Sequence, residues 1–256
     1  MILEYLDTPV FYTTAGHGNP IVLLHGFLET SKIWRPFLEE LSTKRQVICI
    51  DLPGHGGTGN FGEVHPMELM ADVVNSVLEH LNITKATIVG HSMGGYVGLA
   101  FAKRFPGKIS GLALMNSTPE ADSEDKKINR DKAAKLVNRN KKAYINMAIT
   151  NLVAPGNEIT FKREIEELKL EAHKISAKGI IAALMGMKIR TDKINVLRQL
   201  TSYKIMVSGK DDPVLPLNYA ENAAILSKCQ LIIVEGGHLS HIENHSNIRE
   251  MMFFID

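Results

Sequence analysis

Residues 87–95 read TIVGHSMGG, and this run carries the strongest structural signal in the chain. The strand-like Thr87–Val89 leads directly into Gly90-His91-Ser92-Met93-Gly94, which matches G-x-S-x-G, and Met93–Phe105 then follows a helical pattern. A serine at a sharp strand-to-helix turn projects its Oγ, and glycines let the strand and the helix approach closely. The context therefore predicts that Ser92 is a nucleophile and not an incidental serine in a Gly-rich turn.

Short runs rich in apolar and β-branched residues predict further strands on both sides of this turn. Between them lie segments of helical period, such as Pro66–Leu81. This alternation is typical of an α/β fold with a mostly parallel central sheet and helices on both faces. Besides Thr87–Val89, the expected strands are Val10–Thr13, Ile21–Leu24, Val47–Ile50, Gly111–Met115, Tyr203–Val207 and Leu231–Val234.

The alternation fails between about residues 118 and 190. A highly charged stretch, residues 120–142, precedes helical patterns without a convincing strand, and the strand pattern returns at Tyr203. We predict one core domain made of residues 1–117 and 191–256, with residues 118–190 inserted as a helical unit over one edge of the sheet.

Composition narrows the class of partner. The 29 basic and 28 acidic residues leave a formal charge of +1, which gives no electrostatic reason to expect nucleic acid or an anionic membrane, so we expect a small-molecule substrate. Cys49 and Cys229 have no zinc-site spacing and are expected to be buried free thiols. An acidic N-terminus without a secretion signal, and no apolar run of about 18 residues, predict a cytoplasmic protein. The oligomeric state stays open.

A serine hydroxyl needs a base within hydrogen-bond reach, and in this kind of fold the chain order is serine, acid, histidine. Ser208–Pro213 follows the expected strand at Tyr203–Val207, and Gly236-Gly237-His238 follows the next one. Because the carboxyl ends of parallel strands meet at one edge, we predict His238 as the base and an aspartate of the first turn as its partner. Asp211 and Asp212 share that turn, and the residues alone do not decide between them.

Two other histidines compete with His238. His241 and His245 lie where a terminal helix is expected to begin, whereas His238 follows a strand after two glycines. Position therefore favours His238.

Two backbone N–H groups are predicted to stabilise the oxyanion. Met93 begins the helix after Ser92, and its N–H points toward the developing charge. Phe27 lies in the loop after the strand Ile21–Leu24 and is the second donor. The Phe27 side chain is also expected to border the acyl pocket, with Trp34 nearby, while His25 braces the loop.

Other ligand motifs are weak or absent. Residues 51–59 contain G-x-G-x-x-G, but not at the opening of the fold and without the following strand and acid that a dinucleotide site requires. The chain has no Walker A sequence and no H-E-x-x-H, and its ten histidines are too dispersed in sequence to argue a metal site. We expect no cofactor and no metal.

Together these motifs resemble the α/β-hydrolase superfamily, over nearly the whole chain except the insertion. Residues 25–27 look like its oxyanion loop, 51–56 (DLPGHG) like its D-x-x-G-H-G loop, 90–95 like its nucleophile elbow, 212–216 (DPVLP) like its acid turn and 237–238 like its histidine turn. The resemblance implies a catalytic triad of Ser92, Asp212 and His238, and makes residues 118–190 a helical cap over the site. A dehalogenase is disfavoured because its nucleophile would be aspartate.

The expected function is hydrolysis of a small carboxylic ester through an acyl-enzyme on Ser92. Met147 and Leu184 in the cap would suit an apolar substrate group, although such residues are more often core. One alternative is a menaquinone-pathway-type lyase or a carbon–carbon bond hydrolase with the same triad; the lyase needs arginines facing the pocket, and Arg130, Arg139 and Arg190 lie in the cap segment. Another is a ligand-sensing receptor with a vestigial triad.

Overall fold

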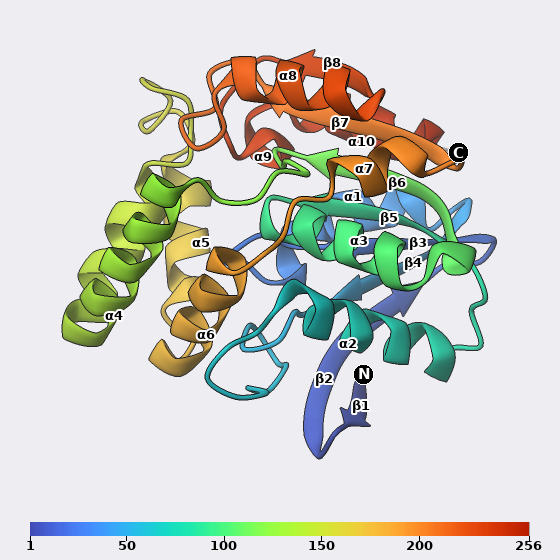
Figure 1. The fold of residues 1–256 in the computed structure, drawn as a ribbon, viewed down its shortest axis with the longest axis horizontal. Coiled ribbons are helices and arrows are strands. Elements are labelled where there is room, and N and C mark those ends of the chain that lie inside the picture. The colour runs from blue at the N-terminus through green and yellow to red at the C-terminus, as the bar shows by residue number, and fades with distance from the viewer. Residues whose placement is uncertain (256) are drawn as a thin grey trace.

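A computed structural model describes residues 1–255 and contains one eight-stranded sheet with the order β1-β2-β4-β3-β5-β6-β7-β8 (Figure 1). The strands from β4 to β8 run parallel, while β2 pairs antiparallel with β1 and β4. The strands are β1 (Ile2–Tyr5), β2 (Thr8–Ala15), β3 (Asn19–Leu24), β4 (Arg45–Ile50), β5 (Ala86–His91), β6 (Ile109–Met115), β7 (Tyr203–Gly209) and β8 (Gln230–Val234).

The central strands are buried on both faces. Every residue of β5 is buried, as are the last four of β3 and the last five of β6. Strands in this position read as continuous apolar runs because helices cover both sides of the sheet. Their register brings Leu24, Gly90 and Leu114 side by side, so the ends of three strands meet where Ser92 follows β5.

Two helical layers cover the sheet. On one face, α2 packs on α3, α3 on α7 and α7 on α8; on the other, α1 packs against α10 (Figure 1). The helices of these layers are α1 (Arg35–Leu41), α2 (Met67–His80), α3 (Met93–Arg104), α7 (Ile194–Gln199), α8 (Leu217–Ser227) and α10 (His245–Phe254). Three shorter helices lie in the connections: the 3₁₀ helices η1 (Ser31–Trp34) and η2 (Pro106–Lys108), and α9 (Ser240–Glu243).

Between β6 and α7 the chain forms three helices and no strand. They are α4 (Glu124–Thr150), α5 (Lys162–Ala172) and α6 (Ala177–Lys188), and α4 packs against both of the others. Figure 1 shows the three together at one side of the sheet. Backbones meet closely at this junction, because a Cβ on Gly186 of α6 would lie only 1.7 Å from the carbonyl oxygen of His65 in the core.

The mostly parallel sheet is confirmed, and all seven expected strands lie within observed ones. The sequence analysis missed β1. This strand lies at the sheet edge and is only partly buried, and its hairpin turn is Leu6-Asp7, with φ of 48° and 56°. Such a turn is usually marked by Asn-Gly or Asp-Gly, so its sequence signal was absent. Cys49 and Cys229 are both buried and free, as expected.

No helix within residues 1–255 combines the length and the apolar character that crossing a membrane requires.

Candidate active site

Ser92 stands at a strained turn between β5 and α3. Its φ of 49° and ψ of −112° place a non-glycine residue in a region that costs about 1–3 kcal/mol. The neighbours must be glycine: a Cβ on Gly90 would lie 2.3 Å from the carbonyl oxygen of Gly94, and one on Gly94 would lie 2.3 Å from that of Leu24. The sequence G-x-S-x-G is therefore a steric requirement of this turn.

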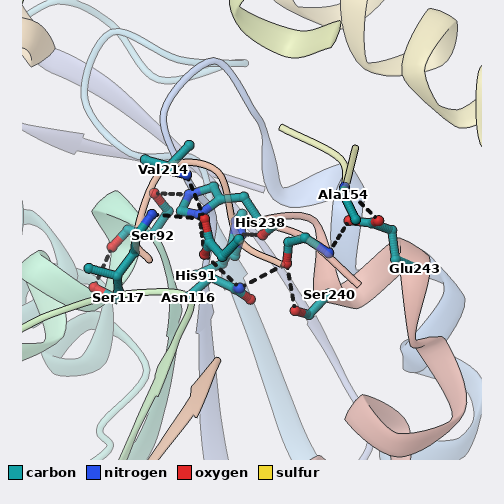
Figure 2. Close-up of polar contacts among 12 residues, drawn as sticks. His91, Ser92, Asn116, Ser117, Ala154, Val214, His238, Ser240 and Glu243 are labelled. Carbon is teal, nitrogen blue, oxygen red and sulfur yellow. Dashed lines mark hydrogen bonds and ion pairs between the residues drawn. The ribbon is translucent and has the colours of Figure 1, made fainter. Parts of the chain in front are cut away.

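His238 contacts both Ser92 and Asp212. Its Nε2 lies 2.8 Å from Ser92 Oγ, and its Nδ1 lies 2.8 Å from Asp212 Oδ2 (Figure 2). Nδ1–H donates to the carboxylate, so in the neutral ring Nε2 is left to accept the serine proton. The three residues form the arrangement that activates a serine hydroxyl.

Asp212 is held as a carboxylate. Its Oδ1 accepts the backbone N–H groups of Val214 at 2.8 Å and Leu215 at 2.9 Å. Burial by itself would raise the pKa of Asp212, but the facing His238 and the hydrogen-bond donors outweigh it and lower that pKa. Asp211 is exposed, and only its backbone is hydrogen-bonded, to Gly236. The geometry thus selects Asp212, as the family resemblance implies.

Sequence reasoning missed the two residues after β6. Asn116, at φ 48°, donates its side-chain amide to Asp212 Oδ2 at 3.0 Å and to the carbonyl oxygen of Gly237 at 3.1 Å. Ser117 donates its hydroxyl to the carbonyl oxygen of Ser92 at 2.8 Å (Figure 2). Their signal was available, because polar residues that directly follow a buried parallel strand lie at the same edge as the site.

His91 sits behind Ser92 and links two loops. Its Nδ1 lies 2.8 Å from Oε2 of Glu29, and its Nε2 lies 2.9 Å from the backbone carbonyl oxygen of His238. A neutral imidazole donates from only one nitrogen, so both bonds form only when His91 is an imidazolium. Burial alone would lower the pKa of His91, but the Glu29 carboxylate raises it above its usual value.

Glu29 is the buried counter-ion, and sequence reasoning missed it as well. Burial would raise its pKa, but His91 holds it at about 2. The same Oε2 accepts the backbone N–H of Gly26 at 2.6 Å, so Glu29 also fixes the loop after β3. One ion pair therefore connects the loop after β3, the turn at Ser92 and the loop that carries His238.

A third buried residue, His241, adjoins this pair. Burial lowers the pKa of His241 to about 3, so it is neutral, and its Nε2 lies 3.8 Å from Glu29 Oε1. Ligand atoms of Glu29, His91 and His241 all lie within 4.8 Å of one another, the one such three-residue group within residues 1–255 that could hold a metal ion. Although dispersed in sequence, these side chains meet in space. The two acceptors facing His91 favour an ion pair over a metal ligand set.

The histidine loop, residues 235–244, is attached to the segment between α4 and α5. The carboxylate of Glu243 accepts the backbone N–H groups of Gly237 and Ala154 and the side-chain amide of Asn157, each at 2.9 Å. Figure 2 shows Glu243 beside Ala154. The backbone N–H of His238 donates to the carbonyl oxygen of Leu152 at 2.8 Å. The segment between α4 and α5 therefore helps to position the histidine, which no local pattern indicated.

Two loops flagged in the sequence have bracing roles. Buried His25 donates from Nδ1 to the carbonyl oxygen of Gly26 and accepts the backbone N–H of Leu52 at Nε2, as expected for a brace. Asp51 accepts the backbone N–H groups of Ser31 and Gly57. The G-x-G-x-x-G run is thus folded around the Asp51 carboxylate.

Two adjoining hollows lie beside the triad. One of about 90 Å³ is lined by Phe27 and Ser92, and one of about 240 Å³ is lined by Leu184; both are bordered by His238 and Arg130. Larger hollows of about 420 and 400 Å³ lie elsewhere, between η1 and α5, and do not touch Ser92. Phe27 and Leu184, both expected to bind substrate, therefore each line one of the two hollows beside His238.

Two residues that were expected to bind substrate, Trp34 and Met147, do not line the hollows beside Ser92. Trp34 does not line either hollow: it is fully buried, with ring centroids 6.1 Å from Phe37 and 6.2 Å from His241. It follows the oxyanion loop in sequence, but η1 turns it into the core. Met147 is 50% exposed and also lines neither hollow, because it projects from the outer side of α4.

The structure also sorts the rival histidines and the cap arginines. His245 stacks on Phe37 at 4.4 Å, and His241 adjoins Glu29, so His238 alone of the three reaches Ser92. Of the arginines, Arg130 borders the hollows, Arg139 is exposed, and Arg190 is buried against Asp122.

Comparison with known proteins shows the family to which the chain belongs. A family model described as the alpha/beta hydrolase fold matches residues 19–156. This chain is a member of the α/β-hydrolase family. A solved structure of a malate-bound thermophilic esterase from Thermogutta terrifontis has a TM-score of 0.90 to this α/β-hydrolase, with 28% identity and coverage of 96% of this chain and 92% of that one.

Curated relatives of this α/β-hydrolase include several activities. A pimeloyl-[acyl-carrier protein] methyl ester esterase of Aliivibrio salmonicida is 26% identical over 252 residues, 94% of this chain and 93% of that protein. A dihydrolipoyllysine-residue acetyltransferase component of the acetoin cleaving system of Pseudomonas putida is 27% identical over 240 residues, 92% of this chain. The match spans only 62% of that second protein. The relatives therefore show a hydrolase family without fixing a substrate.

Proposed function

We propose that this α/β-hydrolase is a serine esterase that cleaves a small carboxylic ester through an acyl-enzyme on Ser92. The observation that carries the proposal is the contact of His238 with Ser92 Oγ on one side and with Asp212 on the other, each at 2.8 Å. The esterases among its relatives support the same reaction class.

In the first half-reaction Ser92 Oγ attacks the ester carbonyl carbon while His238 Nε2 takes the hydroxyl proton. The tetrahedral intermediate then breaks its bond to the alkoxy group, and His238 returns the proton to the departing alcohol. In the second half, water gives its proton to His238 and attacks the acyl carbon, and Ser92 leaves with that proton. Each step uses only side chains of this chain and water.

The oxyanion is assigned to the backbone N–H groups of Phe27 and Met93. Met93 is the first residue of α3, where the helix N-terminus favours negative charge. The N–H of Gly26 already donates to Glu29, so Phe27 is the next donor along the loop that faces the hollow at Ser92. Losing one such donor typically lowers kcat by about 100-fold or more.

The test is multiple-turnover hydrolysis of p-nitrophenyl esters of increasing acyl length by wild type and Ser92→Ala. We expect turnover in the wild type and its loss in the variant, with thermal stability nearly unchanged. Fluorophosphonate labelling of the wild type but not of the variant is the companion result. Absence of turnover for every ester, with Ser92 still labelled, contradicts the esterase proposal and favours a lyase or a ligand-sensing role.

A further inference from the structure

The hollows beside Ser92 carry excess positive charge. Among residues 1–255, the cap contributes Arg130 to both spaces and Lys126 to the larger one, while the only acidic side chain lining them is Glu29. Glu29 is neutralised by the His91 imidazolium, to which it is hydrogen-bonded. The lining thus offers two cations, and its one carboxylate, Glu29, is already balanced by His91.

Arg130 belongs to a cluster of two arginines and one aspartate. Asp122 is fully buried and pairs with two arginines, Arg130 through Nε at 3.1 Å and Arg190 through Nη1 at 2.7 Å. Burial would raise the pKa of Asp122, but the two guanidinium groups lower it, so the acid is charged. One negative charge between two positive charges leaves a net charge of +1 at the edge of the site.

The two arginines differ in what they can still bind. Arg190 is enclosed: it lies 4.0 Å over the ring of Tyr96 and donates to the carbonyl oxygens of Glu120 and Met187. Arg130 is 21% exposed, and its terminal nitrogens have no partner within the described part of the chain. Arg190 therefore supports the cluster, while Arg130, with two terminal NH2 groups that have no partner in residues 1–255, lines the space that adjoins Ser92 and His238.

We propose that Arg130 is a specificity-determining residue that binds a carboxylate on the substrate, so that the substrate is a small ester bearing a negative charge. This inference rests on the esterase proposal above. A guanidinium presents paired N–H groups that match a carboxylate, and a charge-assisted bond in a partly dry site is stronger than a neutral one. Of the two hollows bordered by His238 and Arg130, the one of about 240 Å³ has room for an acid of a few carbons.

The test compares esters that differ only in charge. Monomethyl succinate and methyl succinamate carry the acid and its neutral amide on the acyl side; acetoxyacetate and acetoxyacetamide carry them on the alcohol side. For wild type we expect kcat/KM to favour the carboxylate by about tenfold or more in at least one pair. Arg130→Gln should bring that ratio close to one, and Arg130→Lys should retain part of it. Arg139→Gln, an exposed arginine on the same helix, is the matched control and should keep the wild-type ratio.

A binding measurement separates this inference from the esterase proposal. In Ser92→Ala, calorimetry should show tighter binding of the favoured carboxylate than of its amide, and Arg130→Gln in that background should remove the difference. Wild type without any ester turnover but with this binding preference would contradict the esterase proposal and support the carboxylate site. Equal kcat/KM and equal binding for acid and amide in both pairs, or a preference that survives Arg130→Gln, would overturn the role of Arg130.

Discussion

The nucleophile elbow and the histidine loop hold their residues in place by different means. At the elbow, residues 86–95, backbone packs on backbone, and the glycines at positions 90 and 94 permit it. In the histidine loop, residues 235–244, side chains hold the turn: Asn116, from the end of β6, and Glu243, from within the loop, both hydrogen-bond Gly237. The first arrangement involves only neighbouring residues, whereas the second also needs Asn116 and the contacts of Glu243 with Ala154 and Asn157, which are distant in sequence.

Breaking the elbow should have the largest effect. In Gly94→Ala the new Cβ would lie 2.3 Å from the carbonyl oxygen of Leu24 and 2.8 Å from that of His25, both backbone atoms that cannot move aside cheaply. We expect a loss of about 3 kcal/mol in the free energy of unfolding and at least about 100-fold in kcat. Urea unfolding and ester turnover measure both. Gly107→Ala, where a Cβ meets nothing within 4 Å, is the control and should leave both nearly unchanged.

Glu29→Gln weakens the contact between the nucleophile elbow and the histidine loop, which His91 makes through the carbonyl oxygen of His238. The substitution removes the negative charge that keeps His91 doubly protonated. We expect a loss of about 2 kcal/mol at pH 6 and a lower kcat. Glu29, with its pKa depressed to about 2, stabilises the fold above about pH 4.5 and ceases to do so as pH falls toward 2. His91, with its pKa raised, stabilises the fold below about pH 6.5, and this contribution disappears as pH rises through the raised pKa.

The pair therefore stabilises most between about pH 4.5 and 6.5. Unfolding measured from pH 4 to 10 should show wild type losing more stability above pH 6.5 than Glu29→Gln does. Parallel curves for the two proteins would show that His91 is not held as an imidazolium. Nitrogen chemical shifts of the His91 ring report its protonation state directly. A merely structural role of Glu29 would leave these shifts the same in wild type and Glu29→Gln.

Glu243→Ala should have the smallest effect, because it loosens the histidine loop without touching the turn at Ser92. Three hydrogen bonds to the carboxylate disappear, and we expect a loss of about 1.5 kcal/mol and a several-fold fall in kcat. Glu235→Ala is the control in the same loop, since its exposed pair with Lys210 should contribute less than about 0.5 kcal/mol. If Glu243→Ala costs no more than Glu235→Ala, the cap segment does not position His238.

This contrast explains what the sequence could predict. Ser92, Asp212 and His238 follow strand ends within short motifs, and their positions and mutual contacts agree with the expectation. Glu29 and Asn116 were missed because their partners lie 62 and 121 positions away and meet them only in the assembled fold. Glu243 contacts nearby Gly237, but its other partners, Ala154 and Asn157, lie 89 and 86 positions away, so its full role was not visible in sequence either. Trp34 was expected near the acyl pocket because it follows residues 25–27 closely in sequence. It lies in the core instead, because sequence position does not fix the direction in which η1 points a side chain.

The same limit applies to the cap. Its helical character was readable from residues 118–190, but the side of each helix that faces the site was not: Leu184 lines a hollow beside His238, whereas Met147 is half exposed and lines neither hollow. Arg130 was one of three equivalent arginines until the structure placed it beside Ser92 and left Arg139 exposed.

The most direct test of the central claim is to trap the covalent intermediate. Wild type is mixed rapidly with a short-chain p-nitrophenyl ester, quenched in acid, digested and analysed by mass spectrometry. The account predicts one acyl group per chain, on the peptide that contains Ser92, and no p-nitrophenol release above background in Ser92→Ala. An acyl group on another residue, or release that persists in Ser92→Ala, would contradict it.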